Sequence, residues 1–173
     1  MKLQIKQKFI SGLFLFILCS QNHAEGEAER YRQAGLPSTT ADVFEHLAKD
    51  EHASIRQRVA SNRKTPAKIL MELAHDTDMA VRISVATNLS TNEETYLVLA
   101  RDPEQAVRSV VARFEYVPVP ALILLSKDRD IDIRIAVARN LNSTKAILNM
   151  LINDKNNNVS SVAEQALMRL AEE

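Results

Sequence analysis

Residues 66–91 read PAKILMELAHDTDMAVRISVATNLST, and this stretch of 26 residues decides the fold. Ile69 and Leu73 are spaced as on one face of a helix, and Val81 and Val85 mark the apolar face of a second helix. The polar segment between them predicts a turn. Helices of two to three turns are marginal alone in water, so neighbouring segments must cover their apolar faces.

The pattern recurs with a period of 26 residues and without an insertion from residue 40 to residue 169. One apolar column consists of leucines alone: Leu47, Leu73, Leu99, Leu125 and Leu151. A period between about 20 and 50 residues is typical of repeat architectures. The sequence predicts an all-α fold, an α-solenoid of about five two-helix repeats in residues 40–173. The predicted units are 40–65, 66–91, 92–117, 118–143 and 144–169.

Composition agrees with closely packed helices. Hydrophobic residues make up 46% of the chain and aromatic residues only 5%. The 3 glycines and 5 prolines are too few for a turn-rich β-protein. The 22 basic and 22 acidic residues give a formal net charge of zero, which provides no electrostatic reason to expect nucleic acid as a partner.

The N-terminus has the pattern of an export signal. Lys2, Lys6 and Lys8 precede the apolar run 9–18, which is too short to span a bilayer but suits a signal peptide. Cys19 follows this run directly and is a candidate lipidation site, which would give a signal of residues 1–19 and membrane attachment through a lipid. The alternative is cleavage after residue 24. Either reading predicts an exported protein, periplasmic or lipid-anchored in the cell envelope.

Residues 20–39 form a predicted polar linker, partly helical near 28–34. Removing the three lysines of the signal leaves 19 basic against 22 acidic residues, a charge of −3. Either cut also leaves a domain without a disulfide, which must rely on its core.

Polar columns repeat in the same register. Aspartates fall in the predicted turn within each unit: Asp50, Asp76, Asp102 and Asp128. Arginines follow each of them by six residues: Arg56, Arg82, Arg108 and Arg134. A carboxylate there suits the positive end of a helix, and the guanidinium can bridge carboxylates of its own and the adjacent unit. We expect a structural ladder along the loops.

A third polar column lies near the end of the second helix of each unit. It contains Asn62, Asn88 and Asn140. Asparagine tolerates the left-handed conformation that closes a helix, and its amide can bond to the turn. We expect this column to be structural too.

The segments Leu73-Ala74-His75-Asp76, Val81-Arg82 and Val85-Ala86-Thr87-Asn88 resemble the leucine-rich repeat variant family. The resemblance covers residues 40–169 and implies units that pair an α-helix with a second, often tighter helix in a right-handed superhelix. The Asp-to-Arg spacing is similar to that of HEAT-type repeats. One branch of the family carries an iron–sulfur module, but no cysteine follows Cys19, so the resemblance implies no such cofactor here.

Catalytic signals are missing from the sequence. His46, His52 and His75 lack the clustered spacing of a metal site, and Gly35 is the last glycine, so a glycine-rich phosphate loop is excluded over the repeats. We predict a protein that is not an enzyme and needs no cofactor or metal.

Positions that depart from the repeat pattern are the best candidates for functional residues, because the repeated residues are explained by stacking. In the third unit, Phe114 replaces the asparagine, and Tyr116 follows in an apolar turn. With Arg113 they form the predicted partner-binding group, an aromatic anchor for a protein or peptide, although local repacking also explains them. In the last unit Ser160 replaces the arginine, as in a capping repeat.

These features favour a non-catalytic protein-interaction scaffold of the cell envelope. An accessory or maturation factor related to HEAT-like lyase proteins is a second hypothesis. A third is a nucleic-acid-binding solenoid that uses the basic stripe of Arg56, Arg58, Arg63 and Lys64, although charge and export argue against it.

Overall fold

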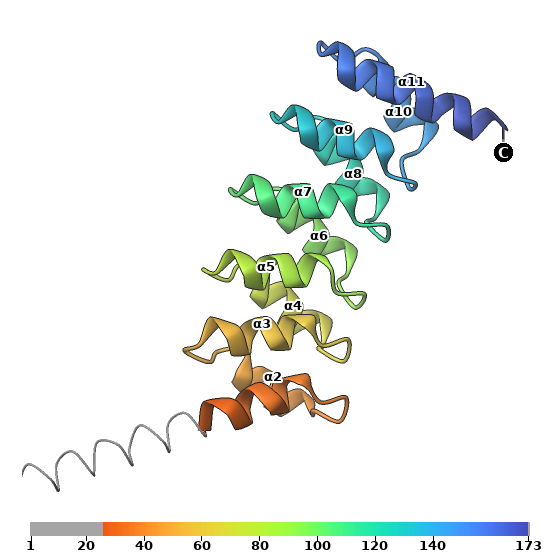
Figure 1. Ribbon diagram of the computed structural model, residues 1–173. Coiled ribbons are helices and arrows are strands. Elements are labelled where there is room, and N and C mark those ends of the chain that lie inside the picture. Colours follow the sequence, from red (N-terminus) through yellow and green to blue (C-terminus); the bar gives the residue numbers. More distant parts are fainter. Residues whose placement is uncertain (1–25, 173) are drawn as a thin grey trace, which may run out of the picture.

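The computed structural model describes residues 26–172, and all regular structure within that range is helical (Figure 1). Each unit contributes a first helix and a second helix. The first helices are α2 (Ala41–Leu47), α4 (Ala67–Leu73), α6 (Glu93–Leu99), α8 (Val119–Leu125) and α10 (Lys145–Ile152). The second helices are α3 (Ala53–Ser61), α5 (Met79–Ala86), α7 (Gln105–Arg113), α9 (Ile131–Arg139) and α11 (Asn157–Glu172).

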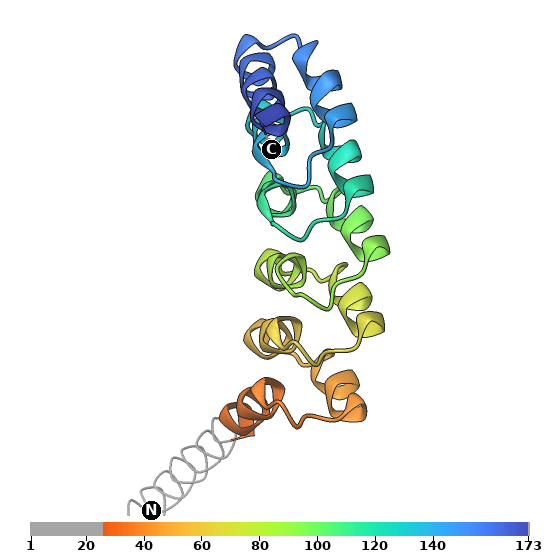
Figure 2. The same ribbon diagram turned by 90° about the vertical axis from the view of Figure 1, so that its right-hand side faces the viewer.

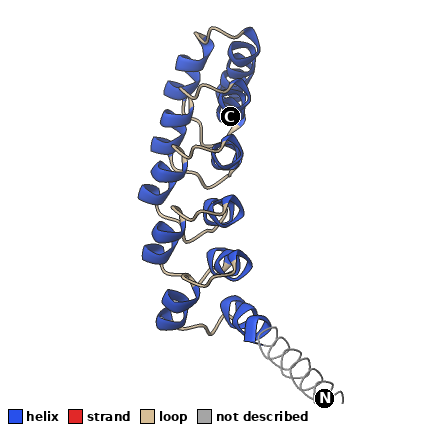
Figure 3. Cartoon of the chain, turned by 90° about the vertical axis from the view of Figure 1, so that its left-hand side faces the viewer, coloured by secondary structure: helices blue, strands red, loops and turns tan. Residues whose placement is uncertain are grey.

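The helices form two layers along an elongated array (Figure 2). All first helices lie in one layer and all second helices in the other, and the opposite view shows the same separation (Figure 3). The loops within units follow one long edge of the array, and the turns between units follow the other edge (Figure 1). The predicted all-α fold of stacked helix pairs is therefore confirmed.

The core lies between the layers and continues from unit to unit. The column that opens each second helix is completely buried: Ile55, Val81, Val107, Ile133 and Val159. The leucine column of the first helices is at most 3% exposed. Each such side chain contributes roughly 1.5–3 kcal/mol when it is fully buried. Because neither helix of a unit can bury its stripe alone, the helix pairs are stable only when stacked.

Residues 26–39, which the sequence predicts as part of a polar linker that is helical near 28–34, belong to the array. Residues 26–35 are helical and act as the second helix of an incomplete unit. Arg30, which lies 26 residues before Arg56, binds Asp50. Thr39 Oγ1 donates to the Gln33 carbonyl, as Thr65 Oγ1 does to the Val59 carbonyl one unit later. The preceding first helix has no counterpart in the described residues, which is why the half unit reads as a linker in sequence.

Both helices of every complete unit are α-helices, so the tighter second helix that the resemblance implies is not found in residues 26–172. Side chains cap several helix starts. Asp78 and Asp130 accept backbone amides at the starts of α5 and α9, and Asn92 does so at the start of α6.

The predicted signal, its cleavage sites and Cys19 lie outside the described residues. Within residues 26–172, no helix combines the length and the apolar character needed to cross a bilayer.

Candidate binding surfaces

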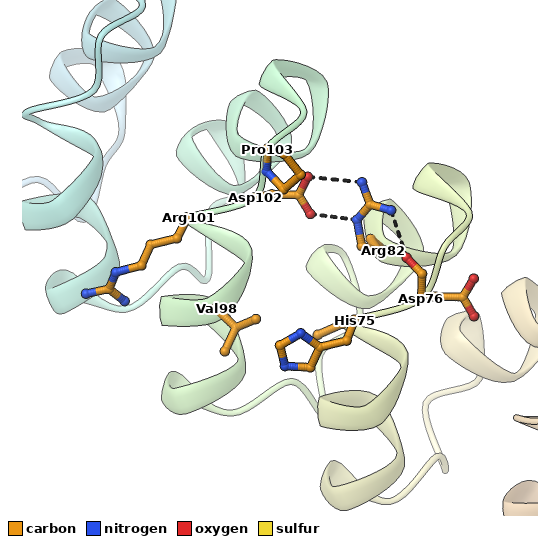
Figure 4. A pocket seen from close by; sticks show the side chains of 8 residues that line it. His75, Asp76, Arg82, Val98, Arg101, Asp102 and Pro103 are labelled. Carbon is orange, nitrogen blue, oxygen red and sulfur yellow. Dashed lines mark hydrogen bonds and ion pairs between the residues drawn. The ribbon is translucent and has the colours of Figure 1, made fainter.

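The Asp and Arg columns connect successive units at the loop edge. Arg82 Nε donates to Asp102 Oδ2 at 2.6 Å, and Arg82 Nη2 donates to Asp102 Oδ1 at 3.1 Å. Arg82 Nη1 donates to the carbonyl oxygen of Asp76 at 2.8 Å. The guanidinium thus binds the carboxylate of the next unit and a backbone carbonyl of its own unit (Figure 4). The prediction that the guanidinium also bridges to the carboxylate of its own unit is wrong, because it bonds there to the backbone carbonyl instead.

The ion pair recurs along the array with little variation. The pairs are Arg30–Asp50, Arg56–Asp76, Arg82–Asp102, Arg108–Asp128 and Arg134–Asp154. Each aspartate also accepts the backbone amide two residues later, as Asp76 does from Asp78. The carboxylate therefore orders its own loop while it binds the preceding unit. The ladder ends at Asp154 because Ser160 stands where the next arginine would be.

The ladder controls the ionisation of its aspartates. Burial by itself raises the pKa of Asp76 and Asp128, but hydrogen bonds from Arg56 and Arg108 and from backbone amides outweigh burial and hold each pKa below its ordinary value. The pKa of Asp154 is lowered mainly by the hydrogen bond from Arg134. These carboxyl groups remain ionised while the units stay stacked.

A hollow of about 480 Å³ lies on this edge between the second and third units. Its floor is the Arg82–Asp102 pair, and its rim carries His75, Val98 and Arg101 (Figure 4). Arg101 Nη1 donates to the Leu97 carbonyl of its own helix at 2.9 Å. The charged groups on the floor are already bound to each other, so this hollow belongs to the stacking rather than to a reaction centre.

The asparagine column forms a second ladder on the opposite edge. Asn88 Nδ2 donates to the carbonyls of Ala60 and Asn62 in the preceding unit, at 2.6 and 2.9 Å. Asn62 and Asn140 make the equivalent bonds. These carbonyls lie at helix ends, where intrahelical partners are missing. The predicted left-handed conformation is wrong: Asn62 and Asn140 are extended, with φ of −77° and −68°.

The third unit replaces this amide bridge by another group. Phe114 occupies the asparagine position, so no side-chain amide reaches the end of α5. Instead, the Tyr96 hydroxyl donates to the Ala86 carbonyl at 3.2 Å. Tyr96 lies at a position that is Phe44, Leu70 or Leu122 in other units. Burial raises its pKa to about 12. Tyr96 thus supplies the bond between the second and third units that is lost where Phe114 replaces the asparagine.

The predicted aromatic anchor separates into two parts. Phe114 packs against the core and stacks on Tyr96 with ring centroids 6.3 Å apart. Tyr116 meets the Phe114 ring edge-on at 5.7 Å and is 60% exposed. Phe114 therefore has a packing role, and the tyrosine ring is the part that a partner can reach.

Exposed apolar side chains continue along the turn edge. Leu89 follows α5 and is 47% exposed, and Leu141 follows α9 and is 79% exposed. With Tyr116 they form three successive turns that each present a large apolar side chain, which we call the turn-edge stripe. Large apolar side chains exposed at corresponding places in three successive turns make this edge a candidate binding surface.

Arg113 adds charge beside this stripe. It lies in the last turn of α7, and Arg139 takes the equivalent place in α9. Both side chains are exposed and line a hollow of about 290 Å³ with Ile135 and Asp132. Unlike the ladder arginines, neither makes a side-chain hydrogen bond or ion pair within residues 26–172. They are available to a carboxylate from outside.

The basic stripe that would favour nucleic acid is shorter than expected. Arg56 is bound bidentately to Asp76, at 2.7 and 2.9 Å, and belongs to the ladder. Arg58, Arg63 and Lys64 remain exposed around the turn after α3. These three exposed basic residues all belong to the first unit.

Comparison with known proteins supports the architecture. No family model matches the sequence, and no curated protein matches it. A solved structure described as a leucine-rich repeat variant with a novel repetitive protein structural motif is similar, with a TM-score of 0.60 and 25% identity. The match covers 78% of this chain and 52% of that one. The chain is an α-solenoid of repeated helix pairs. It spans about half the length of the structure it matches.

The α-solenoid contains no group of three or more His, Cys, Asp and Glu side chains placed to hold a metal ion within the described residues. Arg139 and the two stripe leucines, Leu89 and Leu141, were missed in the sequence. A comparison of equivalent positions could have found the two leucines, because their column alternates between charged and apolar residues: Arg63, Leu89, Glu115 and Leu141. Their exposure, however, depends on how the turns pack.

Proposed function

We propose that this α-solenoid is a non-catalytic scaffold that binds a protein or peptide segment on the turn edge of the third and fourth units. The observation that carries the proposal is the exposed Tyr116 ring, which lies in a turn that Asn142 bonds to the next turn, where Leu141 is exposed. Exposed aromatic and aliphatic side chains of this kind are frequent anchors in protein interfaces. The solenoid supplies a rigid support, because ladders on both edges hold the units in register.

The surface also suggests the chemistry of the partner. Tyr116 and Leu141 offer apolar contact, while Arg113 and Arg139 offer unpaired guanidinium groups close by. Guanidinium groups bind carboxylates in a bidentate way. An extended segment that combines apolar and acidic side chains fits this arrangement best.

The cell envelope is the proposed location. The support is the sequence of residues 1–24, in which three lysines precede a ten-residue run of mainly apolar residues and Cys19. Processing of the wild-type chain and of Cys19→Ala, with and without globomycin, tests the lipid anchor. Retention of the precursor by globomycin in the wild-type chain alone supports lipidation, and identical processing of both chains contradicts it.

A random peptide library displayed on phage tests the binding surface. Peptides selected on the full chain should contain apolar and acidic residues and should bind Tyr116→Ser/Leu141→Ser at least about tenfold more weakly. Ile123→Ser/Met150→Ser is the matched control, because these side chains are 41% and 43% exposed on the first-helix layer. Equal loss in both double variants, or no selectable peptide, contradicts the proposal.

Salt dependence tests the contribution of the arginines. Arg113→Ala/Arg139→Ala should weaken binding of the selected acidic peptides and flatten the dependence of their affinity on salt concentration. Unchanged affinity and salt dependence would assign the peptide to the apolar stripe alone and reject the acidic part of the proposal.

A further inference from the structure

A third hollow lies at the other end of the array, where residues 26–39 meet the first unit. Its volume is about 440 Å³. Arg58, Arg63 and Lys64 line it together with Gly35, Pro37, Ser61 and Asn62. Three of the lining residues are basic and none is acidic, so the hollow is a local site of positive potential in a chain of zero formal net charge.

The guanidinium of Arg58 is held in place by two neighbours. It lies over the Tyr31 ring, 5.4 Å from the centroid, in a cation–π contact. It also rests against Gly35, where an added Cβ atom would collide with Arg58 Nε. Any side chain at position 35 would push the guanidinium away. The hollow is therefore built around a positioned arginine.

The repeat does not need these residues for stacking. Equivalent positions in later units carry unrelated side chains: Ser84, Val110 and Ala136 for Arg58; Leu89, Glu115 and Leu141 for Arg63; Ser90, Tyr116 and Asn142 for Lys64. Gly35 aligns with Ser61 and Thr87. Arg58 and Gly35 contribute to the contact between residues 26–35 and the first unit, but later units stack without residues of the Arg63 and Lys64 type, so stacking alone does not account for these two side chains.

Arg63 and Lys64 are free to bind a ligand. Both are exposed, and neither side chain makes a hydrogen bond or ion pair within residues 26–172. The ladder arginine of the same unit, Arg56, is by contrast fully engaged with Asp76. The hollow thus combines one arginine held by its neighbours with two basic side chains that have no partner within residues 26–172.

We propose that this hollow binds a phosphate group. Its three positive side chains more than neutralise a phosphate dianion, and guanidinium and ammonium groups are both common phosphate ligands in proteins. Free phosphate compounds and the headgroup of an anionic phospholipid present this same chemistry. The site lies two units away from Tyr116, so it is independent of the proposed peptide surface.

A nucleic acid is a poorer match for the same site. Duplex binding needs basic residues spread along several phosphates. The equivalent positions of the next units are Leu89, Glu115 and Leu141, so this basic cluster is interrupted at the second unit, and the next exposed arginines on the turn edge are Arg113 and Arg139.

Nuclear magnetic resonance of the ¹⁵N-labelled full chain in alkyl maltoside micelles tests the proposal. Inorganic phosphate and phosphatidylglycerol are titrated separately, and duplex DNA serves as a third probe. At least one phosphate probe should bind saturably and shift the amide signals of Gly35, Ser61 and Asn62. Arg63→Ala/Lys64→Ala should weaken that binding about 25-fold, from roughly fivefold per basic side chain near a phosphate-bearing surface.

Two further variants sharpen the test. Arg129→Ala/Lys155→Ala removes the same charge from exposed positions on the opposite edge and should leave binding unchanged. Gly35→Ala should displace the flexible end of Arg58 and weaken binding without unfolding the chain.

The outcomes separate the possible ligands. Binding of inorganic phosphate points to a soluble phosphate compound, and binding of phosphatidylglycerol alone points to a lipid headgroup. The proposal is overturned if neither probe binds saturably, or if Arg63→Ala/Lys64→Ala and the control pair weaken binding equally. Tighter binding of duplex DNA than of both phosphate probes would also overturn it, in favour of nucleic acid.

Discussion

Removal of one ladder arginine tests how the units are held together. In Arg108→Ala, Asp128 loses hydrogen bonds at 2.7 and 3.2 Å, and the carbonyls of Asp102 and Pro103 lose theirs at 2.9 and 3.1 Å. The side chains of Arg108 and Asp128 are each only 7% exposed. The substitution therefore leaves a nearly buried carboxylate without its counter-charge, and only the amide of Asp130 still donates to it.

The expected cost follows from that burial. Removing one partner of a buried ion pair typically costs about 3–5 kcal/mol, and the proximity of solvent places this site near 3 kcal/mol. For a chain of this size, such a loss lowers Tm by about 6–12 °C. The remaining units keep their apolar contacts, so the variant should stay helical. Thermal unfolding followed by circular dichroism measures both quantities.

Arg101→Ala is the matched control because Arg101 is exposed and bonds only to its own helix. Its effect should stay within about 0.5 kcal/mol. The double variant Arg108→Ala/Asp128→Ala should lose less stability than the two single changes together, since no unpaired carboxylate remains. The reasoning is refuted if Arg108→Ala melts with the control, or if the two single effects simply add.

Two further predictions concern the same interfaces. Tyr96→Phe removes the hydroxyl that bonds to Ala86 and should lower the free energy of unfolding by about 1 kcal/mol. The exposed Tyr116→Phe is the control and should leave it almost unchanged. Equal Tm values for the two variants would show that the Tyr96 hydroxyl does not replace the missing asparagine bond. Acid should destabilise the fold, because folding lowers the pKa of four ladder aspartates: Asp50, Asp76, Asp128 and Asp154. Their contribution to stability is complete above the unfolded pKa of about 3.9 and is lost as the pH falls through the folded pKa values. Urea midpoints measured from pH 7 to pH 3 check the direction, and a flat profile would contradict it.

The sequence by itself determined the architecture, for a physical reason. Short amphipathic helices at a strict period of 26 residues can bury their apolar faces only against copies of themselves. The same register identified the Asp and Arg columns as contacts between units and the Asn column as structural. Spacing along the chain is enough for these conclusions, because equivalent residues in stacked units occupy equivalent places.

Only the tertiary structure decided which partners these residues take. It joined each arginine to the carboxylate of the next unit, and it incorporated residues 26–39 into the array through Arg30 and Asp50. It also separated Phe114, which packs on Tyr96, from Tyr116, which faces solvent. Exposure and the choice of partner depend on neighbouring units in space, and the sequence of one unit does not contain that information.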